Sequence, residues 1–143
     1  MERRKILDLK NWLQGTWAFE RTVQDFKHNQ VGKMTGQGDF TLHQNGLLYE
    51  EQAQFSFGTY QDEVQQSYLY SFSSHSCADV CFIDGRLFHT LDLSTGQDQS
   101  LHRCGADTYR GFFKILNSRH FLIIWNIDGP KKKMIIKTKL HKS

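Results

Sequence analysis

The chain contains little proline, little cysteine and no long apolar run. One proline and eleven glycines in 143 residues are too few for a low-complexity or disordered protein. No segment approaches the length that spans a bilayer, and the basic start is followed by only two apolar residues, Ile6 and Leu7, so it lacks the apolar core of a secretory signal. We therefore expect a soluble, cytoplasmic protein that does not enter a membrane.

The chain also lacks a large excess of positive or negative charge. The formal net charge is +3 and the sequence pI is about 8.8, which falls short of the clustered basic excess of a nucleic-acid-binding protein. A run of three lysines, residues 131–133, precedes Lys137, Lys139 and Lys142 on the last strand. Alternate lysines on a terminal strand favour a solvated outer face over a basic binding stripe. Phosphate-loop, paired-cysteine zinc and dinucleotide motifs are missing from the sequence, so no cofactor is assigned.

The three cysteines do not form a disulfide framework. Cys77 and Cys81 would lie roughly 13 Å apart along an extended strand, too far to bridge each other. The third, Cys104, has no predicted partner. Reduced thiols fit the cytoplasmic assignment.

What the chain does have is aromatic residues, 13% of the total, and alternation of apolar with polar residues. Residues 3–13 carry apolar side chains at helical spacing, and from Thr16 onward the period changes to two. About nine or ten antiparallel strands follow, joined by short turns. We predict one all-β domain over residues 1–143, an up-and-down β-barrel with a short N-terminal helix that closes one end. A β-sandwich is the alternative.

Three predicted two-residue turns set the direction of the side chains. Asn45-Gly46 is a strong hairpin signal that would place Phe40 opposite Glu51, and so carry Glu51 to the inner face. A slip of one residue would send Glu51 to solvent but would also expose three aromatic residues of the same strand, at a much larger cost.

The turns at Asp84-Gly85 and Gly105-Ala106 place further polar residues inside. The first pairs Val80 with His89 and Phe82 with Leu87, and leaves Phe88 in a row facing solvent. The second has glycine at its first position, as a type II′ turn requires, and gives the pairs Cys104–Asp107 and His102–Tyr109.

The inner face therefore carries a row of polar side chains, and such a row inside a barrel predicts a pocket. The row consists of Arg21, Glu51, His89, His102, Cys104, Asp107 and Tyr109. One interpretation is a network that satisfies itself, with Arg21 and Glu51 as an ion pair. Alternatively, Arg21 would receive a carboxylate or phosphate of a ligand. Two histidines with cysteine or aspartate could also bind a metal, but the spacing matches no metal motif, so no metal is predicted.

Two resemblances support the barrel. Residues 13–17 (LQGTW), after a short helix, resemble the Gly-x-Trp opening of lipocalins and the wider calycin group of ligand-binding barrels. Lipocalins also have a late arginine that packs on this tryptophan, where the last strand here offers only lysines: Lys137, Lys139 and Lys142.

Over nearly its full length the chain is similar to a family of small, uncharacterised bacterial and fungal domains with a lipocalin-like barrel. The matching segments are residues 15–21 (GTWAFER), 84–93 (DGRLFHTLDL), 102–109 (HRCGADTY) and 125–131 (WNIDGPK). The resemblance implies the fold and implies no particular chemistry.

The sequence thus leads to three functional hypotheses. The first is a barrel that binds a small, partly apolar, anionic molecule through Arg21, Glu51, His89, His102, Asp107 and Tyr109, a composition typical of ligand pockets. The second is a small hydrolase, isomerase or lyase that uses His102, Cys104, Asp107 and Tyr109 as its catalytic residues. The third is a structural or interaction module, including a homodimer, whose interior is filled by side chains.

Overall fold

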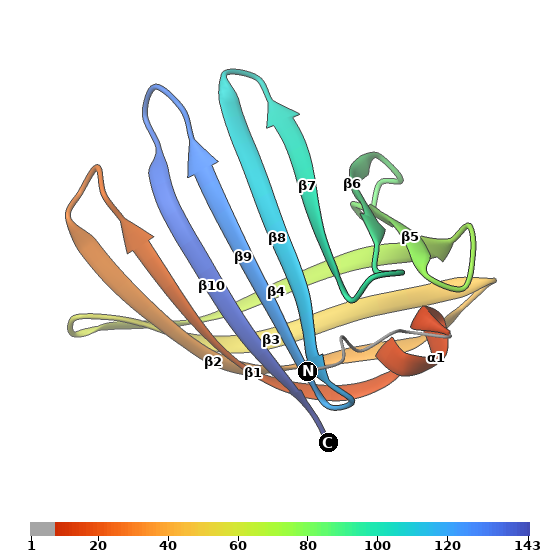
Figure 1. Cartoon of the computed structure of the whole chain (residues 1–143). Helices are drawn as coiled ribbons and strands as arrows, with labels where there is room; N and C mark the ends of the chain where they lie inside the picture. The colour runs from red at the N-terminus through yellow and green to blue at the C-terminus, as the bar shows by residue number, and fades with distance from the viewer. Residues whose placement is uncertain (1–7) are drawn as a thin grey trace.

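The computed structural model describes residues 8–143 as a short helix followed by a ten-stranded antiparallel sheet (Figure 1). Neighbouring strands lie in the order β6-β5-β4-β3-β2-β1-β10-β9-β8-β7. The predicted all-β, up-and-down barrel with an N-terminal helix is confirmed. The elements are α1 (Leu9–Leu13), β1 (Gly15–Asp25), β2 (Gln30–His43), β3 (Gly46–Phe57), β4 (Tyr60–Phe72), β5 (Cys77–Cys81), β6 (Leu87–Asp92), β7 (Gln97–Cys104), β8 (Asp107–Asn117), β9 (His120–Asp128) and β10 (Lys133–Lys142).

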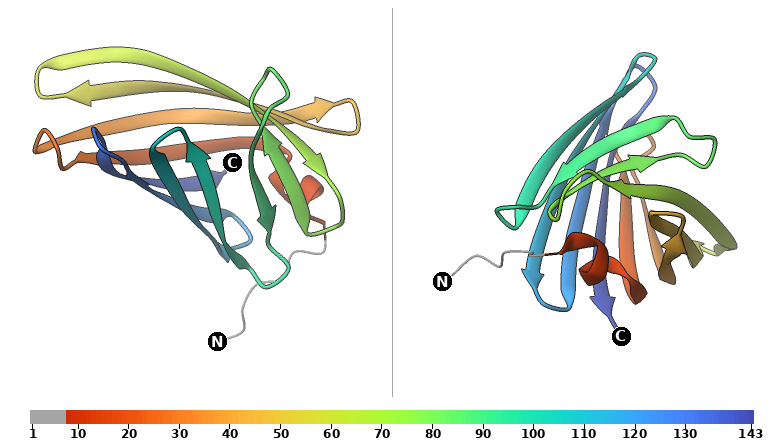
Figure 2. Two further views of the ribbon diagram at one scale, coloured as in Figure 1. Left: turned by 90° about the horizontal axis from the view of Figure 1, so that it is seen from above. Right: turned by 90° about the vertical axis from the view of Figure 1, so that its right-hand side faces the viewer.

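The barrel is nearly closed, and its two edge strands, β6 and β7, meet along one seam (Figure 2). Two side chains of β7 join this seam to the backbone of β6. Asp98 Oδ2 accepts a hydrogen bond from the Asp92 N–H at 2.7 Å, and Ser100 Oγ donates to the Thr90 carbonyl at 2.6 Å. These bonds partly satisfy the exposed polar groups of the two sheet edges.

Helix α1 lies at the end of the barrel where β1 begins (Figures 1 and 2). Asp8 caps it by accepting the Asn11 N–H, and its apolar side buries Leu9 and Leu13 completely. Trp17, at the start of β1, is also fully buried and donates its indole N–H to the Leu13 carbonyl. Within the described residues the predicted helix 3–13 covers Leu9–Leu13, and residues 3–7 of that prediction lie outside the described residues.

Lys142 packs on the buried tryptophan of the Gly-x-Trp segment. Its Nζ lies 5.7 Å from the ring centroid of Trp17 and donates to the Trp12 carbonyl at 2.5 Å. The cation–π contact that lipocalins make with an arginine is therefore made here by a lysine. The side chain also ties the last strand to α1.

Of two hairpins predicted from their turn residues, β7–β8 has the predicted register and β2–β3 does not. The pairs Cys104–Asp107 and His102–Tyr109 are confirmed, with Gly105 at φ +61°. The β2–β3 hairpin differs by two residues: its turn is Gln44-Asn45, so Tyr49 rather than Glu51 faces Phe40. A shift of two keeps each residue on its predicted face, and Glu51 still points inward.

Gly46 explains that shift. It does not occupy the turn but begins β3, where a Cβ would overlap the backbone carbonyl of Tyr70 on β4. The glycine is therefore required for close approach of two strands. Leu42, near the end of β2, is 63% exposed.

A β-bulge corrects the prediction for the β5–β6 hairpin. Val80 pairs with His89 as expected, but Cys81 pairs with Leu87, so Phe88 is an extra residue on β6. A bulge redirects the side chains on either side of it. As a result, Leu87 is 53% exposed, and Phe88, which was assigned to the solvent row, joins the interior.

Candidate functional site

The barrel contains a cavity of about 450 Å³ in its interior. Its walls are mainly apolar and aromatic, with side chains from strands on both sides of the barrel. Polar atoms come from a small set of residues. The polar lining side chains are Arg21, Tyr49, Glu51, Gln65, Gln66, Tyr68, Tyr70, His89, Tyr109 and Thr138.

Arg21 and Glu51 form a two-point ion pair in the wall of the cavity. Arg21 Nη1 and Nη2 donate to the two carboxylate oxygens of Glu51 at 2.7 and 3.0 Å. Arg21 Nε also donates to Thr138 Oγ1 at 2.7 Å, and its guanidinium lies 4.5 Å from the ring centroid of Phe19. The predicted ion pair is therefore present, and it occupies most of the guanidinium donors.

Tyr49 completes this network. Its hydroxyl donates to Glu51 Oε1 at 2.7 Å. Gly38 lies opposite Glu51 on β2, and a Cβ at that position would collide with the Tyr49 ring, so the glycine provides the space for this ring. The network joins β1, β2, β3 and β10.

Burial determines the charge states around this network. Burial would lower the pKa of Arg21, but the hydrogen bond and charge of Glu51 outweigh it, and the pKa is raised. Desolvation, with the Glu51 carboxylate as a second cause, holds the pKa of Tyr49 well above its usual value. Burial likewise raises the pKa of Tyr68 and Tyr70. The phenols therefore stay neutral at physiological pH.

His89 is a neutral imidazole inside the barrel. It is only 6% exposed, and desolvation lowers its pKa to about 4, with the nearby His102 as a smaller cause. Its Nδ1 lies 3.2 Å from the Thr90 carbonyl, which can only accept, so Nδ1 carries the proton. Nε2 is then the unprotonated nitrogen and an acceptor.

Aromatic side chains gather beside His89. Phe88 stacks on Trp125 with centroids 5.1 Å apart and planes at 16°, and on Phe82 at 4.9 Å and 23°. His102 meets Phe88 edge-on at 5.0 Å, and Tyr109 lies 5.8 Å from His102. The bulge at Phe88 thus adds its ring to an aromatic wall of the cavity.

The predicted inner row is only partly assembled around the cavity. Arg21, Glu51, His89 and Tyr109 line it, whereas His102 lies behind Phe88. Cys104 is exposed at the end of β7.

Asp107 is turned away from that row, with Oδ2 3.9 Å from Lys132 Nζ. Within residues 8–143 no hydrogen bond joins His102, Cys104 and Asp107, and no group of three or more histidine, cysteine, aspartate or glutamate side chains could hold a metal.

The prediction from sequence missed several lining residues. Tyr49 and Thr138 share the inward parity of Glu51 and Leu140, so strand alternation could have identified both. Phe88 could have been suspected as the one large aromatic residue in an otherwise polar row. Tyr68 and Tyr70, two residues apart on β4, also line the cavity, and strand alternation places them on one face.

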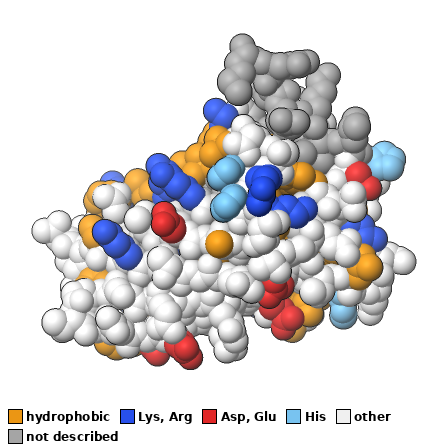
Figure 3. All heavy atoms as spheres, turned by 90° about the horizontal axis from the view of Figure 1, so that it is seen from below, with side chains coloured by type: hydrophobic (Ala, Val, Ile, Leu, Met, Phe, Trp, Pro, Cys, Tyr) orange, Lys and Arg blue, Asp and Glu red, His pale blue; other side chains and the backbone are white. Residues whose placement is uncertain are grey.

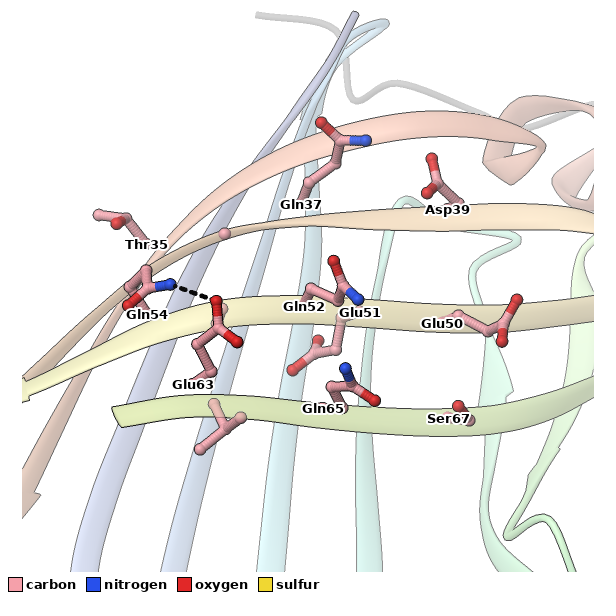
Figure 4. Close-up of a pocket in the computed structure, with 13 residues that line it drawn as sticks. Thr35, Gln37, Asp39, Glu50, Glu51, Gln52, Gln54, Glu63, Gln65 and Ser67 are labelled. Carbon is pink, nitrogen blue, oxygen red and sulfur yellow. Dashed lines mark hydrogen bonds between the residues drawn. The ribbon is translucent and has the colours of Figure 1, made fainter. Parts of the chain in front are cut away.

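A second hollow, of about 670 Å³, lies on the outer side of β2, β3 and β4 (Figure 4). It is lined by amide and carboxylate side chains, and Gln54 Nε2 donates to Glu63 Oε1 at 2.9 Å across two strands. No helix in residues 8–143 is both long and apolar enough to cross a membrane.

The fold and cavity define a lipocalin-like antiparallel barrel with an enclosed polar and aromatic site. The chain belongs to a family of unknown function, DUF6314, whose model matches residues 13–142. No curated protein matches the sequence.

Two solved structures show the same kind of barrel. The S-type phycobiliprotein lyase CPES from Guillardia theta aligns with a TM-score of 0.69 and 6% identity, over 99% of this chain and 94% of that chain. A de novo designed transmembrane β-barrel aligns with a TM-score of 0.51 and 6% identity over 100% of both chains. At these identities the likeness concerns the fold alone.

Proposed function

We propose that the barrel binds a small, planar and partly apolar molecule in its interior cavity. The observation that carries this proposal is the cavity itself: about 450 Å³, with mainly apolar walls and a few convergent polar groups. Ligand sites in proteins have this composition. The barrel of a phycobiliprotein lyase has the same fold, which is consistent with an interior that handles a ligand.

The aromatic wall favours a flat ligand. Phe88 and Trp125 lie nearly parallel, and the tyrosine rings of β4 line the cavity nearby. Aromatic faces bind conjugated rings by stacking and by burial of apolar area. His89 Nε2 would accept a hydrogen bond from an O–H or N–H group of the ligand.

The pairing of Arg21 favours a ligand without net charge. An anionic ligand was expected from an unpaired Arg21, but Glu51 already neutralises it at two points. A carboxylate or sulfonate would have to compete with this short, buried contact. A neutral polar group avoids that competition.

A matched pair of fluorescent probes tests the proposal. N-phenylnaphthylamine is neutral, and anilinonaphthalene sulfonate adds a negative charge to the same ring system. We expect saturable binding of the neutral probe, with weaker binding of the sulfonate. Native mass spectrometry of freshly purified protein should also show a retained small molecule.

Two tryptophan substitutions locate the probe. Ile123→Trp fills the cavity and should abolish probe binding, whereas Ile124→Trp places the same ring on the outer face of β9 and should leave it intact. Equal probe binding by both variants would contradict a site in the interior.

We infer that residues 1–143 act as one domain in the cytoplasm, where the three free thiols stay reduced. Limited proteolysis that releases a stable fragment much shorter than residues 13–142 would contradict the single domain.

A further inference from the structure

A pair of histidines lies on the outer surface, away from the cavity. His120 at the start of β9 faces His141 near the end of β10, and both are exposed. Their rings stack with centroids 4.6 Å apart and planes at 9°. Figure 3 views the barrel from below and shows two adjoining histidine side chains exposed among lysines and arginines.

The backbone brings these two side chains close. The Lys142 N–H donates to the Arg119 carbonyl at 2.8 Å, immediately beyond the pair. In an antiparallel ladder this bond flanks a non-hydrogen-bonded pair, the kind whose Cα atoms lie about 4.5 Å apart and whose side chains are closest. The proximity is therefore set by the strand register.

Asn117 fixes the proton position of His120. Asn117 Oδ1 lies 2.8 Å from His120 Nδ1 and also accepts the Arg119 N–H at 2.9 Å. Because the atom that accepts a backbone N–H is the amide oxygen, His120 Nδ1 must be the donor. Nε2 of the neutral ring then carries a lone pair, the arrangement seen in histidines that bind metals through Nε2.

Two cations beside the pair, Arg119 and Lys142, are held by backbone carbonyls. Arg119 Nε and Nη2 donate to the Lys142 carbonyl at 3.2 and 3.0 Å, and the Lys142 ammonium donates to the Trp12 carbonyl. Both positive groups are therefore held by carbonyl oxygens. These contacts reduce the repulsion that a metal ion would meet at the exposed rings.

We propose that His120 and His141 form a surface site for a divalent transition metal ion such as Cu²⁺, Ni²⁺ or Zn²⁺. Neutral imidazole suits these ions, and the expected order of affinity is Cu²⁺ first, then Ni²⁺ and Zn²⁺. Two nitrogens on one tetrahedral ion lie roughly 3.3 Å apart, so the two exposed rings must tilt out of their parallel stack until both Nε2 lone pairs point at the ion. Water completes the coordination.

Calorimetric titration of tag-free protein with Cu²⁺ and Zn²⁺ tests the site. We expect one ion per chain at the strongest site, with Cu²⁺ bound more tightly. H120Q and H141Q should each weaken binding by at least ~10-fold, and N117A by about 10-fold through loss of the oriented ring. The matched control H43Q, an exposed histidine of β2, should have no effect.

A second measurement avoids any substitution. Cu²⁺ added below one equivalent should broaden the NMR signals of His120 and His141 before those of the other histidines. Tight binding that H141Q leaves unchanged, or first broadening at another histidine, would overturn the proposal. So would the absence of Cu²⁺ binding at equimolar concentration.

Discussion

Replacing Glu51 by glutamine tests the ion pair in the cavity wall. Glu51 is 3% and Arg21 15% exposed at the side chain, so the substitution leaves a largely buried guanidinium without its anion. Removing one partner of a buried pair costs roughly 3–5 kcal/mol. Because glutamine keeps one acceptor oxygen and Thr138 still accepts from Arg21 Nε, we expect the lower end, about 3 kcal/mol.

Urea denaturation at pH 7 measures this cost. The midpoint should fall while the slope stays constant, since the folded shape is unchanged. The double variant that combines Arg21→Met with Glu51→Gln should be more stable than the sum of the two single losses predicts, by about 1–3 kcal/mol of coupling. A Glu51→Gln loss below about 0.5 kcal/mol, or additive effects, would refute the reasoning.

The same substitution also tests the charge preference of the cavity. Glu51→Gln leaves Arg21 without a counter-ion, so anilinonaphthalene sulfonate should bind more tightly to the variant than to the native protein. The affinity of the neutral N-phenylnaphthylamine should change little. A sulfonate affinity unaltered by the substitution would mean that Arg21 does not govern ligand charge.

Three other predictions follow from the wall and the seam. In the folded protein His89 has a pKa of about 4, against 6.5 ordinarily. Between these pH values the unfolded chain binds a proton at His89 that the folded protein does not, so the free energy of unfolding falls as pH falls from 6.5 towards 4. The loss is about 3 kcal/mol, and urea midpoints at pH 7 and 4.5 should show a smaller decrease for His89→Gln. Gly38→Ala pushes the Tyr49 ring and should lower the free energy of unfolding by about 1–3 kcal/mol in the same assay, where a neutral result would contradict the close contact. Ser100→Ala removes a seam bond and should cost about 1 kcal/mol while speeding amide exchange in β6 and β7, and unchanged exchange would disprove the role of that bond.

Strand alternation predicted the face of a residue well, because a side chain of a strand can point in only two directions. Arg21 and Glu51 were placed inside on this basis, and even the two-residue error at the β2–β3 turn preserved it. Alternation fails at a bulge, where one added residue changes the parity. Phe88 stands out as the one large aromatic residue in an otherwise polar row, but this signal does not say which residue is added.

Depth along the barrel was harder to predict than direction. Cys104 and Asp107 are adjacent to a turn, so their inward parity brings them only to the end of the wall. His89 lies further from its turn and is buried. A face can be read from alternating residues, whereas enclosure depends on how far neighbouring strands extend past the residue, and this is a property of the whole sheet.

The unpaired junction between β6 and β7 has a consequence for how molecules reach the interior. Helix α1 and the buried Trp17 block one end of the barrel, so a ligand would enter through that end only if the core unfolded. The two edges at this junction are held by the side-chain bonds of Asp98 and Ser100, whereas the other adjacent strands are joined by backbone ladders. Among routes through the wall itself, separation of β6 from β7 is therefore the one that breaks no backbone ladder.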